Sequence, residues 1–189
     1  AAYFEDKLFT PADIENNPLQ PGDYENCRFT HCDLSSAELY GTGFIDCEFT
    51  HCNLSMIKAD KKTSFRDVRF TDCKLQGIHF NDCNELLFAA RFENCVLQYA
   101  SFYKMKMKNT LFRNCNFGEA DLSEADFTSA VFDHCDFKLA RFDHTILEKA
   151  DLSSSYNYSI NPEKNKIRKA VFSIPEVTGL LHTYDILIR

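Results

Sequence analysis

The sequence predicts an all-β solenoid made of stacked, four-sided coils, and two nested repeats lead to this prediction. The longer repeat is a Phe-x-x-Cys pattern whose cysteines follow one another at intervals of 20, 21, 22, 20 and 20 residues. These cysteines are Cys32, Cys52, Cys73, Cys95, Cys115 and Cys135. A period near 20 residues that continues over about 100 residues is typical of solenoids, in which each repeat forms one coil.

The shorter repeat is five residues long and lies inside the longer one. Large apolar residues recur at every fifth position from Tyr24 to Leu54, from Phe65 to Phe80 and from Leu87 to Leu152. Of these 25 central positions, 14 are Phe, 9 are Leu, one is Tyr and one is Met. Full burial of one Phe contributes roughly 1.5–3 kcal/mol. We therefore expect the stacked central residues to be a principal source of stability.

Two residues before each centre, the side chain is usually Ala or Cys. A three-residue strand directs its first and third side chains to the same face, and two further residues can turn a corner. The small residue and the central residue then face the interior, and the other three positions face solvent. Four such sides make 20 residues, which matches the spacing of the Phe and Cys columns.

The residue before each cysteine is suited to a corner, because it is always Asn, Asp or His. These residues are Asn26, His31, Asp46, His51, Asp72, Asp82, Asn94, Asn114 and His134. All three types adopt left-handed and turn conformations readily. One extra residue between Leu54 and Phe65, and two between Phe80 and Leu87, interrupt the repeat. We expect both insertions to bulge outward as small corner loops.

The nine cysteines first suggest metal binding or redox chemistry. In the predicted coil, however, Cys32 and Cys52 face inward while His31 and His51 face outward, so they do not converge on one ion. Thiols that interchange with Ala are interpreted as reduced core packing, which favours a cytoplasmic location. No glycine-rich phosphate loop or catalytic constellation is evident. The sequence thus predicts a protein that is not an enzyme, with no catalytic, cofactor-binding or metal-binding residues and no cofactor.

The pattern resembles the pentapeptide-repeat family, whose motif is written A-[DN]-L-x-x. The clearest matches begin at Ala120-Asp121-Leu122, Ala125-Asp126-Phe127 and Ala150-Asp151-Leu152. The resemblance covers about residues 22–154 and implies a right-handed quadrilateral β-helix, the pentapeptide-repeat solenoid. It implies little about function, because the family is functionally mixed.

The two ends are predicted to differ from the repeat. Residues 1–21 have weak repeat character and are expected to form an N-terminal cap, and residues 22–154 form the β-helix. Residues 155–189 are expected to form a capping and dimerisation segment, with a short helix over 175–182 that begins in a capping box and a terminal strand over 184–189. An apolar edge strand there would be exposed in a monomer, and a two-fold dimer would cover it. The expected interface residues are Leu180, Leu181, Tyr184, Ile186, Leu187 and Ile188.

This C-terminal segment is similar to the tail of Qnr-type quinolone-resistance proteins. The residues that carry the similarity are Asn161-Pro162-Glu163, the apolar helix and Asp185-Ile186-Leu187-Ile188. The resemblance implies a homodimer that binds DNA gyrase and topoisomerase IV as a mimic of duplex DNA. Some members of that group carry long loops that contact the enzyme, whereas the insertions here are one and two residues long.

The charge distribution agrees with a basic protein partner. The net charge is −7, which argues against direct binding of nucleic acid, and no apolar run is long enough to span a membrane. Residues 22–115 carry equal numbers of acidic and basic side chains, whereas residues 116–154 carry nine acidic and three basic ones. The expected partner-binding residues are Glu119, Asp121, Glu124, Asp126, Asp133, Asp136, Asp143 and Asp151. Two alternatives stay open: these residues only solvate the rod, or the protein is a scaffold for an unrelated protein partner.

Overall fold

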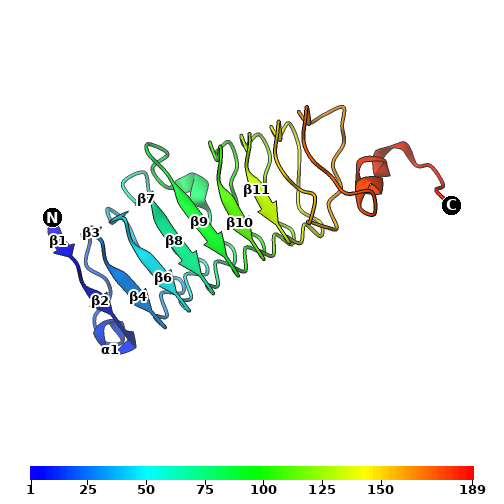
Figure 1. Cartoon of the computed structure of the whole chain (residues 1–189). Coiled ribbons are helices and arrows are strands. Elements are labelled where there is room, and N and C mark those ends of the chain that lie inside the picture. The colour runs from blue at the N-terminus through cyan, green and yellow to red at the C-terminus, as the bar shows by residue number, and fades with distance from the viewer.

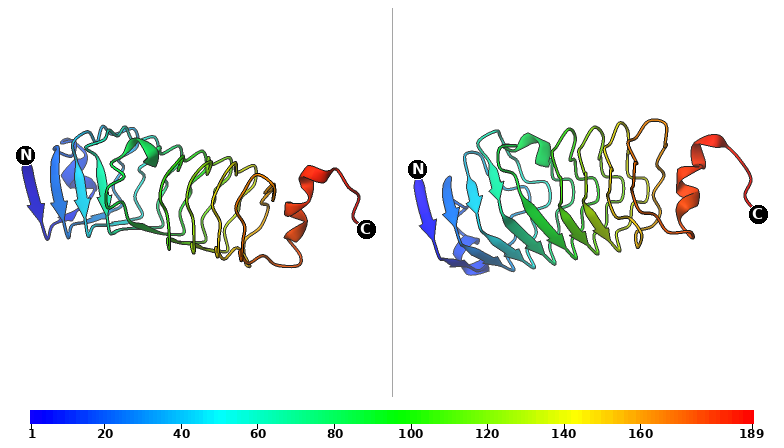
Figure 2. Two further views of the ribbon diagram at one scale, coloured as in Figure 1. Left: turned by 90° about the horizontal axis from the view of Figure 1, so that it is seen from above. Right: turned by 45° about the horizontal axis from the view of Figure 1, so that its top comes forward.

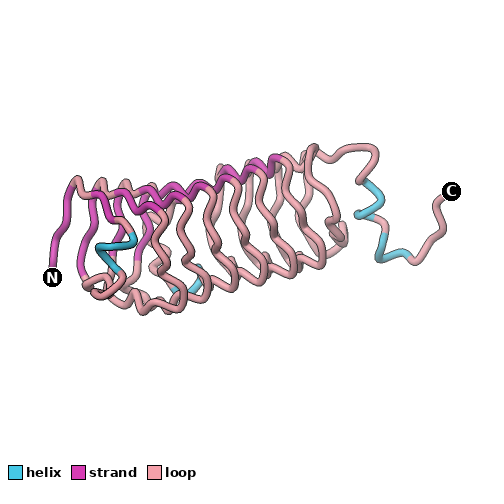
Figure 3. The backbone as a smooth tube through the Cα atoms, turned by 90° about the horizontal axis from the view of Figure 1, so that it is seen from below, coloured by secondary structure: helices cyan, strands magenta, loops and turns pink.

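The computed structural model describes residues 1–189 as a straight rod of parallel, stacked coils (Figure 1). Each coil has four sides. Side 1 carries a four-stranded parallel sheet in the order β1-β3-β5-β7, and side 2 carries a seven-stranded one in the order β11-β10-β9-β8-β6-β4-β2. Sides 3 and 4 are held by isolated parallel bridges, such as Asp33 with Asn53 on side 3 and Ser101 with Asp121 on side 4. In Figure 3 the strands accordingly gather along one part of the wall.

The strands are short, as the five-residue repeat predicts. On side 1 they are β1 (Ala2–Glu5), β3 (Gly22–Glu25), β5 (Gly43–Ile45) and β7 (Ser64–Arg66). On side 2 they are β2 (Leu8–Phe9), β4 (Arg28–Thr30), β6 (Glu48–Thr50), β8 (Val68–Thr71), β9 (Ala90–Glu93), β10 (Leu111–Arg113) and β11 (Val131–Asp133). Only short helices occur: α1 (Pro11–Ile14) and the 3₁₀ helices η1 (Phe80–Asp82), η2 (Val177–Leu180) and η3 (His182–Tyr184).

The phenylalanine column of side 2 is confirmed as a continuous internal stack. Phe112 is in register with Phe92 on one neighbouring coil and with Phe132 on the other. Its ring lies 5.0 Å from that of Phe92 and 5.2 Å from that of Phe132, with interplanar angles of 10° and 6°. All three side chains are completely buried. The predicted inward register is therefore correct.

A thiol or hydroxyl at the small position before a centre also makes a hydrogen bond to the neighbouring coil. The Cys73 thiol donates to the carbonyl oxygen of Phe49 on the preceding coil (3.2 Å), and Cys52 does the same to Phe29 (3.3 Å). Where a hydroxyl replaces the thiol it makes the same bond, as Ser155 does to the Phe132 carbonyl (2.5 Å). All nine cysteines are free and buried, and burial raises the pKa of Cys47 to about 12.

The predicted corner residues adopt the left-handed conformation, with φ between 50° and 55° at eight of the nine positions before cysteine. Asp82 is the exception, because it lies inside η1. Left-handed backbone at a non-glycine residue is tolerated best by Asn, Asp and His. These three residue types therefore suit the corner in front of the cysteines.

The two insertions form loops that contact each other. Lys61 of the first insertion donates to the carbonyl oxygens of Asn81 (2.7 Å) and Cys83 (3.2 Å) in the second, and its ammonium lies 3.7 Å from a Glu85 carboxylate oxygen. Leu87, predicted as a buried central residue, is wrongly assigned: it is 66 % exposed. Phe88 fills the interior instead, with its ring 5.7 Å from that of Phe80. The inward central position on this side of the coil is therefore residue 88, one residue later than the repeat predicts.

Residues 1–21 form the first coil of the stack, and they also close its N-terminal end. Phe4 pairs with Tyr24 through β1 and β3, and Phe9 pairs with Phe29 through β2 and β4. Their rings stack at 4.7 and 4.8 Å respectively. The central positions therefore begin at Phe4, and α1 replaces the next side of this first coil. A Thr10–Asp13 capping box starts α1.

The coil also continues beyond residue 154. Val171 bridges Asp151, and the Leu152 N–H donates to the Val171 carbonyl at 2.8 Å. The chain then leaves the stack through η2 and η3 and ends in an extended tail (Figure 2). The expected helix over 175–182 is replaced by these two 3₁₀ helices, and the expected strand over 184–189 does not form, because no neighbouring strand is present to pair with it.

No helix in the structure combines the length and the apolar character needed to cross a membrane.

Candidate protein-interaction surfaces

The eight acidic residues predicted to bind a partner lie around the rod and do not form one patch. Asp126 is on side 1, Asp133 and Asp151 are on side 2, and Asp136 is on side 3. Asp121 is on side 4, where it bridges Ser101 and Arg141. Glu119, Glu124 and Asp143 lie at or next to corners.

Four of these carboxylates shape the corners that follow them. Asp121 accepts from the Ser123 N–H (2.9 Å), and Asp126 accepts from the Thr128 N–H (3.0 Å). Asp136 and Asp151 accept in the same way from Lys138 and Ser153. A short carboxylate that caps the backbone two residues ahead is a common turn device. These four residues therefore have a structural role whether or not they also bind a partner.

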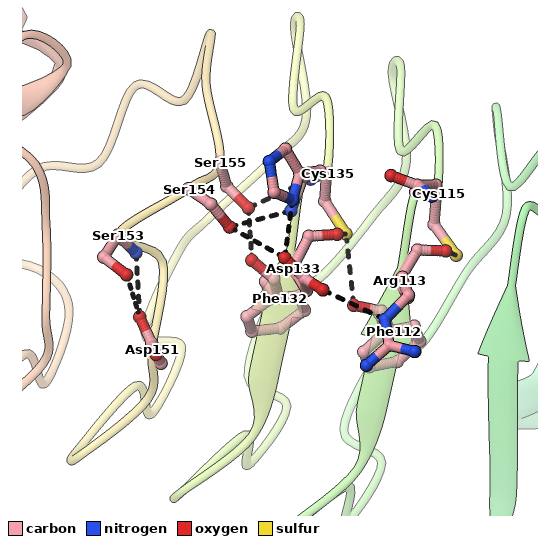
Figure 4. Close-up of polar contacts among 12 residues, drawn as sticks. Phe112, Arg113, Cys115, Phe132, Asp133, Cys135, Asp151, Ser153, Ser154 and Ser155 are labelled. Atoms are coloured by element: carbon pink, nitrogen blue, oxygen red, sulfur yellow. Dashed lines mark hydrogen bonds and ion pairs between the residues drawn. The ribbon is translucent and has the colours of Figure 1, made fainter.

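Asp133 is the centre of a polar cluster on side 2 (Figure 4). Its carboxylate lies 2.6 Å from His134 Nδ1 and accepts from Arg113 Nε at 3.0 Å. Ser154 Oγ also donates to it, at 3.2 Å. The hydrogen bond from His134, followed by that from Arg113, lowers the pKa of Asp133. This carboxylate therefore stays ionised but is partly compensated by Arg113.

Glu119 and Glu124 contribute free negative charge. Both are exposed corner residues in the left-handed conformation, with φ of 55° and 56°. Neither has a side-chain hydrogen bond or ion pair in the structure. Asp143 is different, because its carboxylate lies 2.9 Å from His144 Nδ1 and 3.8 Å from an Arg141 guanidinium nitrogen. Of the predicted residues, the two glutamates are the most available to a partner.

A basic surface lies on side 1, where the coils bring together lysines that are far apart in the sequence. Lys106, Asp126, Ile146 and Lys166 follow one another there through parallel bridges. Beside Lys166 lie Arg168 and Lys169, both exposed and without an ion-pair partner. The acidic excess of residues 116–154 therefore lies mainly on sides 2, 3 and 4. A basic last coil separates it from the C-terminal end.

The C-terminal end exposes the apolar residues predicted to form a dimer. Ile186, Leu187 and Ile188 are 54 %, 88 % and 57 % exposed. Tyr184 is also exposed, whereas Leu180 and Leu181 are half-buried against the last coil. An open depression of about 430 Å³ lies among these elements, lined by Thr178, Leu181, His182, Asp185, Ile186 and Ile188. The predicted interface residues are thus close together.

Gly179 positions this end against the last coil. The Ile160 N–H donates to its carbonyl oxygen at 3.0 Å. A Cβ at residue 179 would overlap the carbonyl oxygen of Tyr158. The absence of a side chain therefore allows η2 to lie directly on the chain below it.

The histidines and cysteines lie on opposite sides of the wall, as expected. The rings of His31 and His51 stack outside at 4.9 Å, whereas Cys32 and Cys52 are buried. No group of three or more His, Cys, Asp or Glu side chains is arranged to hold a metal ion.

Comparison with known proteins agrees with this architecture. The sequence matches the family profiles "Pentapeptide repeat region" over residues 23–85 and "Pentapeptide repeats (8 copies)" over residues 115–153. No curated protein matches the chain in sequence.

Among solved structures, full-length QnrB1, a plasmid-mediated fluoroquinolone resistance protein, is 20 % identical to the chain with a TM-score of 0.63. That match covers 98 % of this chain and 100 % of QnrB1. Two trypsin-treated variants of QnrB1 give TM-scores of 0.61 and 0.63, also at 20 % identity. The repeats, the stacked coils and the two profiles together assign this chain to the pentapeptide-repeat family.

Proposed function

We propose that the protein is a non-enzymatic, dimeric rod that binds DNA gyrase or topoisomerase IV as a mimic of duplex DNA and lowers sensitivity to quinolones. The observation that carries this proposal is the end-to-end structural match with QnrB1, at 98 % and 100 % coverage. The match includes the C-terminal segment beyond the coils and is not limited to the repeat. The nine free thiols fit a reducing, cytoplasmic location.

The acidic sides of the last coils supply the electrostatic part of the proposal. Glu119, Asp133 and Asp143 face solvent on or beside sides 2, 3 and 4, and compensation is only partial. A surface with a net negative potential attracts a basic groove and accelerates association with it. A groove that handles duplex DNA has this character.

The exposed tail supplies the dimeric part. Ile186, Leu187 and Ile188 form an unpaired apolar segment at the end of the solenoid. A two-fold contact through this end would give each tail a neighbouring strand and remove its apolar surface from water. Two rods joined in this way form one longer rod, whose length suits a duplex-like partner surface.

One observation favours a second function, that of a scaffold with an unrelated protein partner. Asp121, Asp126, Asp136 and Asp151 all cap corner backbone. Their acidity therefore has a structural cause that does not require a topoisomerase. The two functions differ in one expectation: binding to a topoisomerase should depend on the free surface charge, above all that of Glu119, whereas a scaffold for an unrelated partner need not depend on it.

A supercoiling assay with purified gyrase, with and without a quinolone, separates the two functions. We expect the protein, at micromolar concentration, either to inhibit DNA supercoiling by gyrase or to preserve that activity in the presence of the quinolone. Glu119→Lys combined with Glu124→Lys should weaken the effect at least about tenfold, because each reversal changes a free charge by two units. The matched control is Glu15→Lys, an exposed reversal at the distant end. No effect of the unaltered protein at micromolar concentration would exclude the topoisomerase function.

Deletion of residues 184–189 tests the dimer. Light scattering at high salt should give the mass of a dimer for the full chain and of a monomer after deletion, since the deleted residues include the exposed apolar side chains Ile186, Leu187 and Ile188. The control is Leu139→Asp, which replaces a side chain that is 70 % exposed but lies on the rod. A monomeric full-length protein would contradict the proposed interface.

A further inference from the structure

Side 1 of the rod is divided into two halves of opposite charge. The outward positions of its first four coils carry the acids Glu5, Asp6, Asp23, Glu25, Asp46 and Asp67, with Arg66 as the only base. The corresponding positions of its last four coils carry the bases Lys106, Lys108, Lys149, Lys166, Arg168 and Lys169, with Asp126 and Glu148 as the only acids. The net charge is therefore −5 in the first half and +4 in the second.

The coil between these halves presents an apolar loop. The chain departs from regular pairing at Asn84, whose N–H donates to the Thr63 carbonyl (2.7 Å), and it rejoins at Ala89, whose N–H donates to the Phe65 carbonyl (3.1 Å). The intervening residues lie on side 1. Leu86 and Leu87 are each 66 % exposed there. Side 1 thus has four acidic coils, an apolar centre and four basic coils.

We propose that side 1 is an interface for a second copy of this chain, which lies antiparallel to the first. A two-fold axis through the fifth coil brings the acidic half of each copy opposite the basic half of the other. The same axis brings the Leu86–Leu87 loops of the two copies together. An apolar centre with a charged rim is the usual anatomy of a protein interface, and a two-fold contact requires a self-complementary surface.

A polyanion is the main competing occupant of the basic half. It would account for Lys166 and Arg168 but not for the acidic coils on the same side, which would repel it, nor for the apolar loop between the halves. A second copy accounts for all three features. This lateral contact is separate from the C-terminal end and does not rest on the proposed binding of a topoisomerase.

Salt dependence provides the first test. We expect the molar mass of the full-length protein by light scattering to rise when salt is reduced from about 0.5 M to about 0.02 M, because screening between exposed charges weakens over this range. The mass at high salt reports the C-terminal dimer, or a monomer if that dimer does not form, so the two contacts are read separately. Equal masses at both salt concentrations would overturn the proposal.

Charge exchange provides the second test. Lys166→Glu with Arg168→Glu lowers the net charge of the basic half from +4 to 0, and Glu5→Lys with Asp23→Lys brings that of the acidic half from −5 to −1. None of the four side chains takes part in an ion pair in this structure. Each double variant alone should lose the low-salt increase in mass, because one half in every facing pair is then neutral or nearly so. An equimolar mixture should regain part of the increase, because the unaltered acidic half of the first variant then faces the unaltered basic half of the second. Retention of the increase by either variant alone, or no recovery on mixing, would overturn the antiparallel arrangement.

The apolar centre is tested by Leu87→Asp, which should abolish the low-salt increase in mass. Leu139→Asp is a matched control, because both leucines have φ of 59° and are 66 % and 70 % exposed. Heparin is the probe for the competing occupant. If the Lys166→Glu and Arg168→Glu variant loses heparin binding while its low-salt mass equals that of the unaltered protein, the basic half binds polyanions and the proposal fails.

Discussion

Replacing Phe112 with alanine is expected to lower the free energy of unfolding by about 3–5 kcal/mol, the usual cost of removing a large aromatic side chain from a packed core. Phe112 is completely buried. Its ring stacks on Phe92 and Phe132 and meets Phe117 edge-to-face at 5.0 Å. The cavity would therefore interrupt a column as well as remove one side chain. Urea titration, with comparison of the midpoint and the slope, measures the effect.

His51→Asn is the control for this prediction. His51 is the corner residue of the equivalent repeat three coils earlier, its side chain is 52 % exposed, and its φ is 52°. Asn retains the preference for this conformation, so the change in unfolding free energy should be near zero. If the two substitutions had equal effects, the assignment of inward and outward positions would be wrong.

Replacing Asn165 with leucine is expected to cost about 3 kcal/mol, although the two side chains have nearly the same shape. Asn165 is buried and makes three hydrogen bonds. Its Oδ1 accepts from the Thr145 N–H (2.9 Å), and its Nδ2 donates to the carbonyls of Phe142 (3.4 Å) and Asn161 (2.9 Å). Leucine would leave the Thr145 N–H and the Phe142 carbonyl without these partners, and each such buried group costs about 1–3 kcal/mol.

The effect should be local, because Asn165 belongs to the last coil, which supports η2 and η3. In a solenoid each coil contacts only its neighbours. We therefore expect the amides of residues 155–184 to lose protection from hydrogen exchange, while those of residues 22–113 keep it. Gln76→Leu, an exposed substitution on side 3, is the control. Loss of protection along the whole rod would show that the last coil is not a separate unit.

Most of the interior could be predicted from the sequence, because its two periods assign nearly all of the inward positions. Phe29, Phe49 and Cys52 needed no information beyond spacing and size. The same spacing reaches back to Phe4 and Phe9, but the prolines at positions 11, 18 and 21 obscured it. The repeat pointed to the wrong centre on side 1 of the fifth coil, because Leu87 precedes Phe92 by the expected five residues whereas Phe88 precedes it by four. Only packing against Phe65 and Phe80 selects Phe88.

The candidate surfaces were harder to predict from the sequence, because a binding surface depends on which side of the coil each side chain lies on. Counting charge along the chain placed Asp126 with Glu119, although they lie on different sides. It also separated Lys106 from Lys166, which the coils bring onto one side. The sequence also could not show that residues 185–189 form no strand, because that depends on whether another strand lies beside them.

The inward thiols and hydroxyls give the rod a direction of growth. Eight of the nine cysteines donate to a carbonyl of the coil before their own, as Cys73 does to Phe49, and Ser155 does the same to Phe132. A coil that emerges from the ribosome therefore finds its acceptors already fixed by the preceding coil. Because synthesis delivers the N-terminal coils first, the protein is suited to co-translational folding by successive addition, with each completed lap serving as the template for the next.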